Sequence, residues 1–276
     1  MLNIRNISIF LVLLFLLSSC GQSLQKLQKS ENLDLKYTKA KEFYNKEQYD
    51  KAIPLFEELI TLRKGTQSID EVYYLFAMSH YKNGNFLVAA FHFKNINDSY
   101  PSSPYAEECL YMVGVSNAEL SPDIPLDQTY TEKAIEAFQL FVNRYPNSQF
   151  LEKSNQQITA LRRKLEMKAL NAAELYFKTG HYKAAATAFS NVLKQFPDTK
   201  DAEKVNFFII KSYYEYAANS VAEKQVERYN QAIKAYENFS AKYKSSGYAK
   251  DAEELYLNAK TNIDKLDPNK TSSSNN

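Results

Sequence analysis

The thiol of Cys20 lies in a context that predicts a covalent modification. Arg5 precedes an uninterrupted apolar run from Ile9 to Leu17, and the run ends in Leu17-Ser18-Ser19-Cys20. Such a run with a basic flank is typical of a secretory signal peptide and is too short to span a bilayer. An aliphatic residue, two small residues and a cysteine form a pattern at which the signal is cleaved and the thiol takes a diacylglyceryl group. The sequence therefore predicts a signal peptide over residues 1–19 and lipidation of Cys20; the alternative is an ordinary secretory signal with an incidental cysteine.

A lipid on Cys20 would fix the chain to a membrane surface. One acyl chain binds only marginally, at about 0.8 kcal/mol per buried methylene, whereas the two or three chains of a bacterial lipoprotein hold almost permanently. Residue 21 is Gly and not the Asp associated with retention in the inner membrane. We therefore expect a lipid anchor in the cell outer membrane, on its periplasmic face. Once Cys20 is lipidated only Cys109 remains, so no internal disulfide is expected.

The remaining composition argues against catalysis and against nucleic-acid binding. Lys and Arg total 34 against 32 acidic residues, a formal net charge of +2, so the chain lacks the positive field that phosphate backbones require. No glycine-rich phosphate loop, nucleophile elbow or paired Cys/His motif occurs in the sequence. His80, His92 and His181 fall on different expected elements, which disfavours a shared metal site. We expect a protein that is not an enzyme and needs neither metal nor cofactor.

A repeat organises the chain after residue 34. In each copy a first helix carrying a small residue leads through a turn to an aromatic residue, and a second helix follows with Ala and further apolar positions. Ala52 and Ala89 mark the first two copies and lie 37 residues apart. Three of the second helices close with an aromatic residue and a proline, which cannot donate the next helical hydrogen bond. The alanines at which the two helices of a pair should touch are Ala52, Ala89, Ala134, Ala185 and Ala232.

This pattern predicts an all-α tetratricopeptide-repeat solenoid of about five helix pairs, in which each pair buries its apolar face against its neighbours. Neither Gly nor Pro occurs between Pro146 and Gly180, so we expect one long connecting helix from near Ser148 to Thr179, about 45 Å in length. A last amphipathic helix would cap the array. The expected segments are signal peptide 1–19, flexible tether 20–34, N-terminal three-repeat lobe 35–147, long helix with C-terminal repeats and cap 148–266, and disordered tail 267–276.

The first helices of the N-terminal repeats should line a concave wall suited to an extended peptide. Tyr offers apolar area with a hydroxyl group, Met adapts its shape, and Lys can pair with a carboxylate. The alternative, which remains open for each residue, is plain packing between helices. The candidate groove residues are Tyr37, Lys41, Tyr44, Tyr74, Met78, Tyr81, Lys82, Tyr111 and Val115.

Several fragments of the chain resemble one family, the outer-membrane assembly lipoproteins called BamD or YfiO. The likeness runs over about residues 17 to 215, from the lipidation signal through the fourth repeat. The fragments that carry it are Tyr81-Lys82-Asn83, Tyr111-Met112 with Gly114, Asp127-Gln128, Tyr145-Pro146-Asn147-Ser148-Gln149-Phe150 and Phe196-Pro197-Asp198-Thr199.

This resemblance implies a scaffold of the β-barrel assembly machinery. Its C-terminal repeats would bind the periplasmic domains of a BamA-like barrel-assembly protein, and its N-terminal groove would receive C-terminal signals of unfolded outer-membrane proteins. Some members place an Arg on the second helix of repeat four for the BamA contact; the matching residue here is Ala188, so that ion pair is not expected.

Two other classes of protein fit part of the pattern. One is a glycan-binding outer-membrane lipoprotein, although such sites usually use Trp and this chain has none. The other is a periplasmic repeat adaptor for cell-wall or division proteins, which shares the repeat spacing but not the lipidation signal. Recovery of a BamA-like partner, as against a transporter or a cell-wall enzyme, would separate these alternatives.

Overall fold

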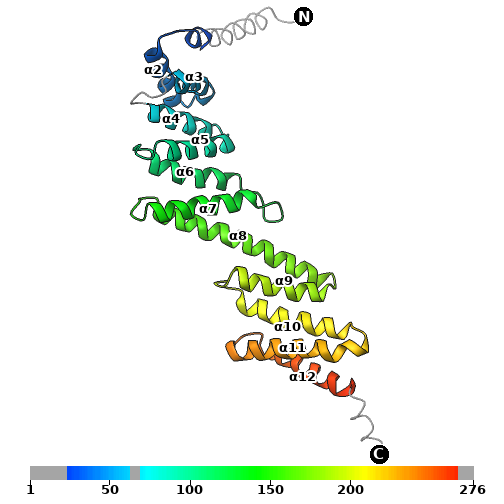
Figure 1. The fold of residues 1–276 in the computed structure, drawn as a ribbon. Coiled ribbons are helices and arrows are strands. Elements are labelled where there is room, and N and C mark those ends of the chain that lie inside the picture. The colour runs from blue at the N-terminus through cyan, green and yellow to red at the C-terminus, as the bar shows by residue number, and fades with distance from the viewer. Residues whose placement is uncertain (1–23, 63–68, 267–276) are drawn as a thin grey trace, which may run out of the picture. The chain divides into compact units, whose positions relative to one another are not determined.

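The computed structural model describes residues 24–62 and 69–266, and all regular elements in these ranges are helices (Figure 1). The predicted signal peptide, the predicted lipidation site Cys20 and the predicted tail lie outside the described residues. The helices are α2 (Leu33–Asn45), α3 (Tyr49–Leu62), α4 (Ile69–Lys82), α5 (Phe86–Ser99), α6 (Ala106–Glu119), α7 (Thr129–Arg144), α8 (Leu151–Lys178), α9 (Tyr182–Gln195), α10 (Ala202–Ala218), α11 (Ala222–Lys242) and α12 (Ala249–Leu266).

Consecutive helices pack on one another as pairs within two compact units, Met1–Leu161 and Arg162–Asn276. The first unit holds the pairs α2/α3, α4/α5 and α6/α7. The second holds α9 against the C-terminal part of α8, then α10/α11, with α12 packed on both of these helices. This arrangement confirms the predicted all-α tetratricopeptide-type fold of five helix pairs with a long helix and a C-terminal cap. None of the helices in the described ranges combines the length and apolar character needed to cross a bilayer.

Small residues set the distance between the two helices of a pair. The five second-helix alanines, Ala52, Ala89, Ala134, Ala185 and Ala232, are at most 1% exposed. The third pair has a glycine at this contact: a Cβ added to Gly114 on α6 would come within 2.6 Å of the ring of Phe138 on α7. The third pair therefore has room for a hydrogen atom at position 114 and for nothing larger without displacement of Phe138.

The turns inside the first, second and fourth pairs use one backbone conformation. Gly84 and Gly180 both have φ of +78°, and the equivalent residue of the first pair, Glu47, has φ of 58°. In each turn the N–H that follows reaches back to a carbonyl of the first helix, as in Gln48 N to Phe43 O at 2.9 Å. This is the left-handed helix ending that glycine adopts without steric cost and that a side chain such as that of Glu47 makes less favourable.

In three of the pairs, a hydroxyl side chain forms hydrogen bonds across the turn that follows the second helix. It lies three residues after the closing aromatic residue, accepts a hydrogen bond from a backbone N–H two residues on, and donates one to a carboxylate of the same repeat's first helix. This feature occurs in the second, third and fourth pairs, and the second and fourth also have the left-handed turn at Gly84 and Gly180. The donor and acceptor pairs are Ser103 with Asp70 at 2.8 Å, Ser148 with Glu107 at 2.5 Å, and Thr199 with Glu166.

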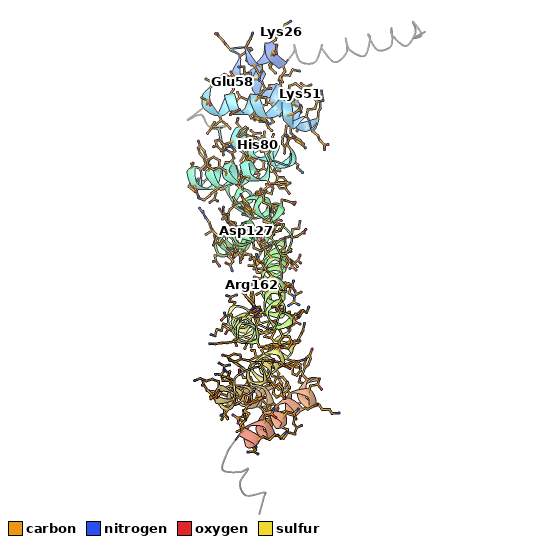
Figure 2. The ribbon with its side chains drawn as sticks, turned by 90° about the vertical axis from the view of Figure 1, so that its right-hand side faces the viewer. Lys26, Lys51, Glu58, His80, Asp127 and Arg162 are labelled. Atoms are coloured by element: carbon orange, nitrogen blue, oxygen red, sulfur yellow. The ribbon has the colours of Figure 1, made fainter. Side chains whose placement is uncertain are left out.

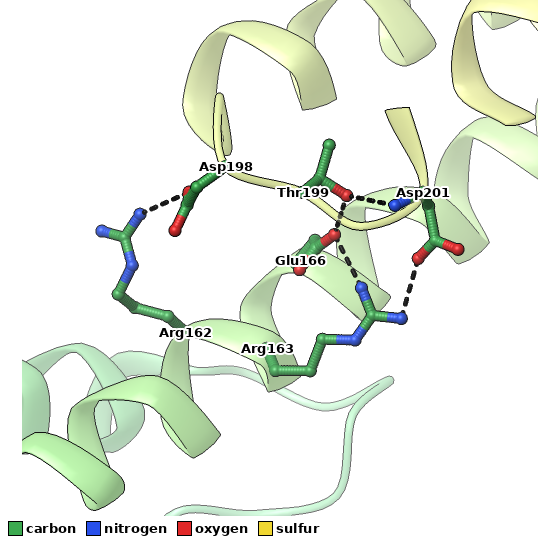
Figure 3. A network of polar contacts seen from close by, with 6 residues as sticks. All are labelled: Arg162, Arg163, Glu166, Asp198, Thr199 and Asp201. Carbon is green, nitrogen blue, oxygen red and sulfur yellow. Dashed lines mark hydrogen bonds and ion pairs between the residues drawn. The ribbon is translucent and has the colours of Figure 1, made fainter. Parts of the chain in front are cut away.

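The hydrogen bond between Thr199 and Glu166 belongs to a small charged network in the second unit (Figure 3). Glu166 lies on α8 and is only 7% exposed. Its carboxylate accepts hydrogen bonds from Thr199 and from Arg163 Nη1 at 2.7 Å, and the same guanidinium reaches Asp201 at 2.8 Å. Because every charge has a partner, this buried carboxylate connects α8 to the turn before α10 without being left unsatisfied.

The residues just before α2 differ from the expected tether. Residues 24–28 are helical, and Leu24 and Leu27 pack against the apolar cluster of the first pair. Lys36, 1% exposed, donates from Nζ to the carbonyl oxygen of Gln28 at 2.7 Å and pairs with Glu58 on α3. Glu58 is labelled among the side chains of the first unit in Figure 2. Two leucines and one backbone carbonyl therefore connect this otherwise polar segment to the folded unit.

Candidate peptide-binding groove

The nine predicted groove residues lie on α2, α4 and α6, the first helices of the three pairs in the first unit. Eight of them are half-buried and Lys82 is exposed, so each offers part of its side chain to solvent. Five belong to one packing group around the second and third pairs, namely Tyr74, Met78, Tyr81, Tyr111 and Val115. Tyr37 and Tyr44 instead pack against the cluster of the first pair.

Lys41 is the centre of a polar contact between α2 and α4. Its Nζ lies 2.8 Å from Glu71 Oε1 and 3.4 Å from the hydroxyl oxygen of Tyr37. The hydrogen bond from Lys41 lowers the pKa of Glu71, and the same bond raises the pKa of Lys41. Burial raises the pKa of Tyr37, with Glu71 adding to the effect. The positive charge of Lys41 is thus already balanced, and Glu71 is a residue that sequence reasoning missed.

Two of the predicted tyrosines stack on aromatic residues that precede the next first helix. The ring of Tyr74 stacks on Tyr105 with centroids 4.5 Å apart, and that of Tyr111 stacks on Phe150 at the same distance. Burial raises the pKa of Tyr74 and of Tyr111. These stacks join one pair to the next, which favours packing as the main role of both tyrosines. The signal that could have found Tyr105 and Phe150 is their shared place two residues after the turn hydroxyl.

Tyr44, Tyr81 and Lys82 keep the most capacity for an outside ligand. Tyr44 meets Tyr49 edge-on at 5.6 Å, and Tyr81 meets Phe86 edge-on at 5.4 Å. Burial raises the pKa of both phenols, with Tyr49 and then Glu108 adding to the effect at Tyr44 and Glu119 at Tyr81, so both remain neutral hydrogen-bonding groups. The predicted groove residues therefore combine tyrosine hydroxyls with lysine ammonium groups, and Glu71 adds a carboxylate beside them.

His80 and His92, expected on separate elements, lie together. Their rings stack with centroids 5.8 Å apart in an aromatic group with Tyr73 and Phe76, where His92 Nδ1 lies 3.3 Å from the Tyr73 hydroxyl. Burial, and then the neighbouring His80, lower the pKa of His92 to about 4. Within the described residues no group of three or more His, Cys, Asp and Glu side chains could hold a metal ion. The pair is thus a neutral packing element at physiological pH.

A known protein family matches most of this chain. The profile of the family YfiO, described as outer membrane lipoprotein, matches residues 29–228, from just before α2 into α11. The chain belongs to the YfiO family. This finding confirms the resemblance drawn from the sequence fragments.

Two curated relatives of this YfiO chain carry the name BamD. The outer membrane protein assembly factor BamD of Caulobacter vibrioides is 22% identical over 192 residues, which cover 70% of this chain and 63% of that protein. A putative outer membrane protein assembly factor BamD of Aquifex aeolicus is 27% identical over 222 residues, covering 75% and 68%. The chain thus spans less than two thirds of the length of the Caulobacter relative.

Among solved structures, the TPR2AB-domain:pHSP90-complex of yeast Sti1 aligns with this YfiO chain at a TM-score of 0.39 and 15% identity. The alignment covers 83% of this chain and 98% of that one. At that level of similarity we rest the fold on the helix pairs of the chain itself.

The family fragments occupy structural positions in this YfiO chain. Tyr81-Lys82-Asn83 lies at the end of α4. Ser148 donates a hydrogen bond to Glu107, and Phe150 stacks on Tyr111. Thr199 donates a hydrogen bond to Glu166. Ala188 lies in a hollow of about 640 Å³ in the second unit. The lining of this hollow also includes Tyr176, Tyr182, Lys183 and Tyr216, and the guanidinium of Arg228 lies 4.1 Å from the centroid of the Tyr216 ring.

Proposed function

We propose that this chain is a non-enzymatic scaffold of the β-barrel assembly machinery, anchored through Cys20 to the periplasmic face of the outer membrane. The observation that carries the proposal is the YfiO family match over residues 29–228, which contains all three pairs of the first unit and most of the second. Stacked helix pairs bind other polypeptides on extended faces without transforming them, and this supports a scaffold role.

In the first unit, the ligand would be the C-terminal signal of an unfolded outer-membrane protein. The half-buried hydroxyls of Tyr44 and Tyr81 can bond to peptide groups, Met78 can adapt to an aromatic side chain, and exposed Lys82 can meet a terminal carboxylate. Lys41 is less suited to that last role because Glu71 already pairs with it.

In the second unit, the partner would be a BamA-like barrel-assembly protein. The hollow around Ala188 offers Lys183, exposed, and the rings of Tyr182 and Tyr216, an aromatic and basic lining that suits an acidic loop. With Ala at position 188, an ion pair to the partner would have to come from a neighbour such as Lys183.

Affinity purification of the lipidated protein from detergent-solubilised envelopes tests the partner assignment. Recovery of a BamA-like protein, together with a loss of outer-membrane barrels on depletion of the chain, is the expected result. Recovery of a transporter or a cell-wall enzyme in its place, with barrel levels unchanged on depletion, would refute the proposal.

The groove assignment has a separate test. Lys82→Glu is expected to weaken binding of a fluorescent peptide with a C-terminal aromatic residue about fivefold, by about 1 kcal/mol, because an attractive rim charge becomes repulsive. Lys153→Glu, an exposed charge reversal on α8, is the matched control and should change binding less than twofold. Equal effects of the two variants would show that the peptide does not bind in this groove.

A further inference from the structure

A groove in the first unit contains none of the nine predicted peptide-binding residues, although it shares the helix α6 with them. It runs between α5 and α7 over α6 and has a volume of about 430 Å³. Its floor is largely apolar, formed by Ala90, Leu110, Val113 and Ala137 together with the amide side chains of Asn97 and Asn117, all less than 10% exposed. Its edges carry three large side chains that face solvent: Leu87 is 56% exposed, Phe91 61% and Leu140 54%. Large apolar side chains gathered around an apolar trough on a soluble surface mark a binding site for another molecule.

The second unit contains the same groove in the same repeat register. A hollow of about 380 Å³ lies between α9 and α11 over α10, and polar side chains line it: Ser190, Asn206, Gln231, Lys234 and Asn238 stand beside Ile209, Tyr213 and Ala235. Counting from the alanines and the aromatic-proline pairs that align the repeats, Asn206 occupies the position of Leu110, and Asn238 that of Leu140. The fold therefore forms this groove equally well with amide side chains.

The other second helices also lack large apolar side chains at the positions of Leu87 and Phe91. At the position of Leu87 they carry Asp50, Glu132, Lys183 and Asn230, all exposed or charged groups. At the position of Phe91 they carry Pro54, Glu136, Thr187 and Lys234. Only α5 has large apolar residues at both positions. Since the helix pairing does not require them, the exposed apolar area of Leu87 and Phe91 needs a cause outside the folding of the unit.

The walls of the groove favour a helical occupant. They are helix faces whose backbone N–H and C=O groups are used within the helices, so an extended strand would lose hydration without gaining backbone partners. A helix brings its own hydrogen bonds and needs only an apolar stripe. The wall from Leu87 to Asp98 has a length of about 16 Å at 1.5 Å per residue, which corresponds to three turns of an opposing helix.

The charged side chains along the groove edges further restrict the kind of helix that can bind. On α5, Lys94 pairs with Asp98 one turn on, and α7 presents Lys133 and Glu136. Each wall therefore carries one cation and one anion, which complements a helix with both Lys and Glu beside its apolar stripe. A strongly basic helix, the kind that binds membrane surfaces, would meet no excess of negative charge here.

We propose that the groove of α5, α6 and α7, formed around Leu87, Phe91 and Leu140, is a docking site for an amphipathic helix of about three turns in another protein of the cell envelope. The docked helix presents apolar residues at positions i, i+4 and i+7, flanked by charges of both signs. The site is independent of the peptide groove on α2, α4 and α6, so either assignment can fail while the other stands.

The probe is a helical peptide of sixteen residues, cross-linked in its helical form, with Leu at i, i+4, i+7 and i+11 and alternating Glu and Lys elsewhere. Its control is a peptide of the same composition with the Leu residues spread around the helix. Binding to the full mature protein in detergent is measured by fluorescence anisotropy. The striped peptide is expected to bind at least tenfold more tightly than the control, and the affinity should change less than twofold between low and moderate salt.

Variants locate the binding. Phe91→Lys and Leu140→Lys should each weaken the striped peptide at least tenfold, whereas Thr187→Lys and Asn238→Lys, the same changes in the second unit, should have less than a twofold effect. All four positions are exposed, so unchanged thermal unfolding is the check on folding. Equal effects in the two units, or no preference for the stripe, would overturn the proposal.

Photo-crosslinking in cells identifies the natural occupant. A photoreactive residue at position 91 should crosslink to a segment whose sequence has an apolar stripe at helical spacing, and the same group at position 187 should not. Crosslinks from position 91 to a second copy of this chain, to lipid, or to a segment without such a stripe would each contradict the proposal.

Discussion

The helices α5 and α9 are each the second helix of a pair, one in the first unit and one in the second. Their buried residues are of the same type, whereas their exposed residues differ. Inside, Ala89 and Phe93 match Ala185 and Phe189, and all four are buried. Outside, the residues that face solvent at equivalent positions have opposite character, as Phe91 against Thr187 illustrates. The interior of a repeat is constrained by the distance between helices, whereas the outer face is constrained only by what it meets. Function in this chain should therefore be sought where equivalent residues disagree.

The largest expected effect is on the free energy of unfolding, and it should differ between the buried and exposed faces of α5. Phe93→Ala removes a fully buried ring and should lower the free energy of unfolding by about 3–5 kcal/mol. Phe91→Ala, two residues away on the exposed face, should change it by less than about 0.5 kcal/mol. Urea unfolding followed by circular dichroism measures both. A large loss for Phe91→Ala would mean that the outer face of α5 contributes to the fold.

A smaller effect is expected at the closest approach of two helices. Gly114→Ala places a Cβ against Phe138 and should cost about 1–3 kcal/mol, although other pairs carry the buried alanines Ala77 and Ala173 at the same position. Gly247→Ala is the control, because nothing lies within 4 Å of the added methyl group. If the two changes have the same effect on the unfolding midpoint, the third pair is not as tight as its geometry indicates.

The histidine pair should make the first unit sensitive to acid. The folded pKa of His92, about 4, lies below its usual value of 6.5, so the unfolded chain binds more protons between these values. Stability is therefore retained above pH 6.5 and lost as the pH falls toward 4, by about 1–2 kcal/mol after allowance for partial exposure. His92→Ala introduces the residue that the second unit carries at Ala188, and unfolding measured at pH 7.5 and pH 4.5 should then differ less than in the parent. An unchanged difference would assign the acid sensitivity to other groups.

The smallest expected effect is a gain. Glu47 adopts the positive φ at which Gly84 and Gly180 stand in the equivalent turns, so Glu47→Gly should raise the free energy of unfolding by about 1 kcal/mol. Gly84→Ala, with open space around the added methyl group, should lower it by a similar amount through backbone strain alone. Hydrogen exchange at the ends of α2 and α4 would report both changes locally. A loss on Glu47→Gly would contradict the equivalence of the turns.

The sequence predicted the features that depend on spacing along one helix pair. The alanine register, the long helix α8 and the cap α12 all follow from local periodicity and from the positions of Gly and Pro. What it could not predict depends on how helices are oriented against one another, both within a pair and between pairs. The stacking of Tyr74 on Tyr105 and the meeting of His80 with His92 require the rotation of one helix about another, which no spacing in the sequence encodes.

The candidate groove shows the same division. Its nine residues were assigned to the correct first helices, but the ion pair that engages Lys41 joins residues thirty positions apart. The segment before α2 was misjudged because Leu24 and Leu27 are isolated among polar residues, and only their contact with the first pair reveals a buried side.

Burial of Lys36 against the carbonyl of Gln28 bears on how near to the bilayer the first repeat can work. With Cys20 as the proposed attachment point, only four residue steps separate the lipid from Leu24, and a fully extended chain covers about 14 Å in that number of steps. A loose stretch through residue 34 would have allowed several times that reach. With that anchor, Leu24 and the pair it packs on would begin within roughly one helix diameter and a half of the headgroups, and a polypeptide bound there would lie near the membrane surface.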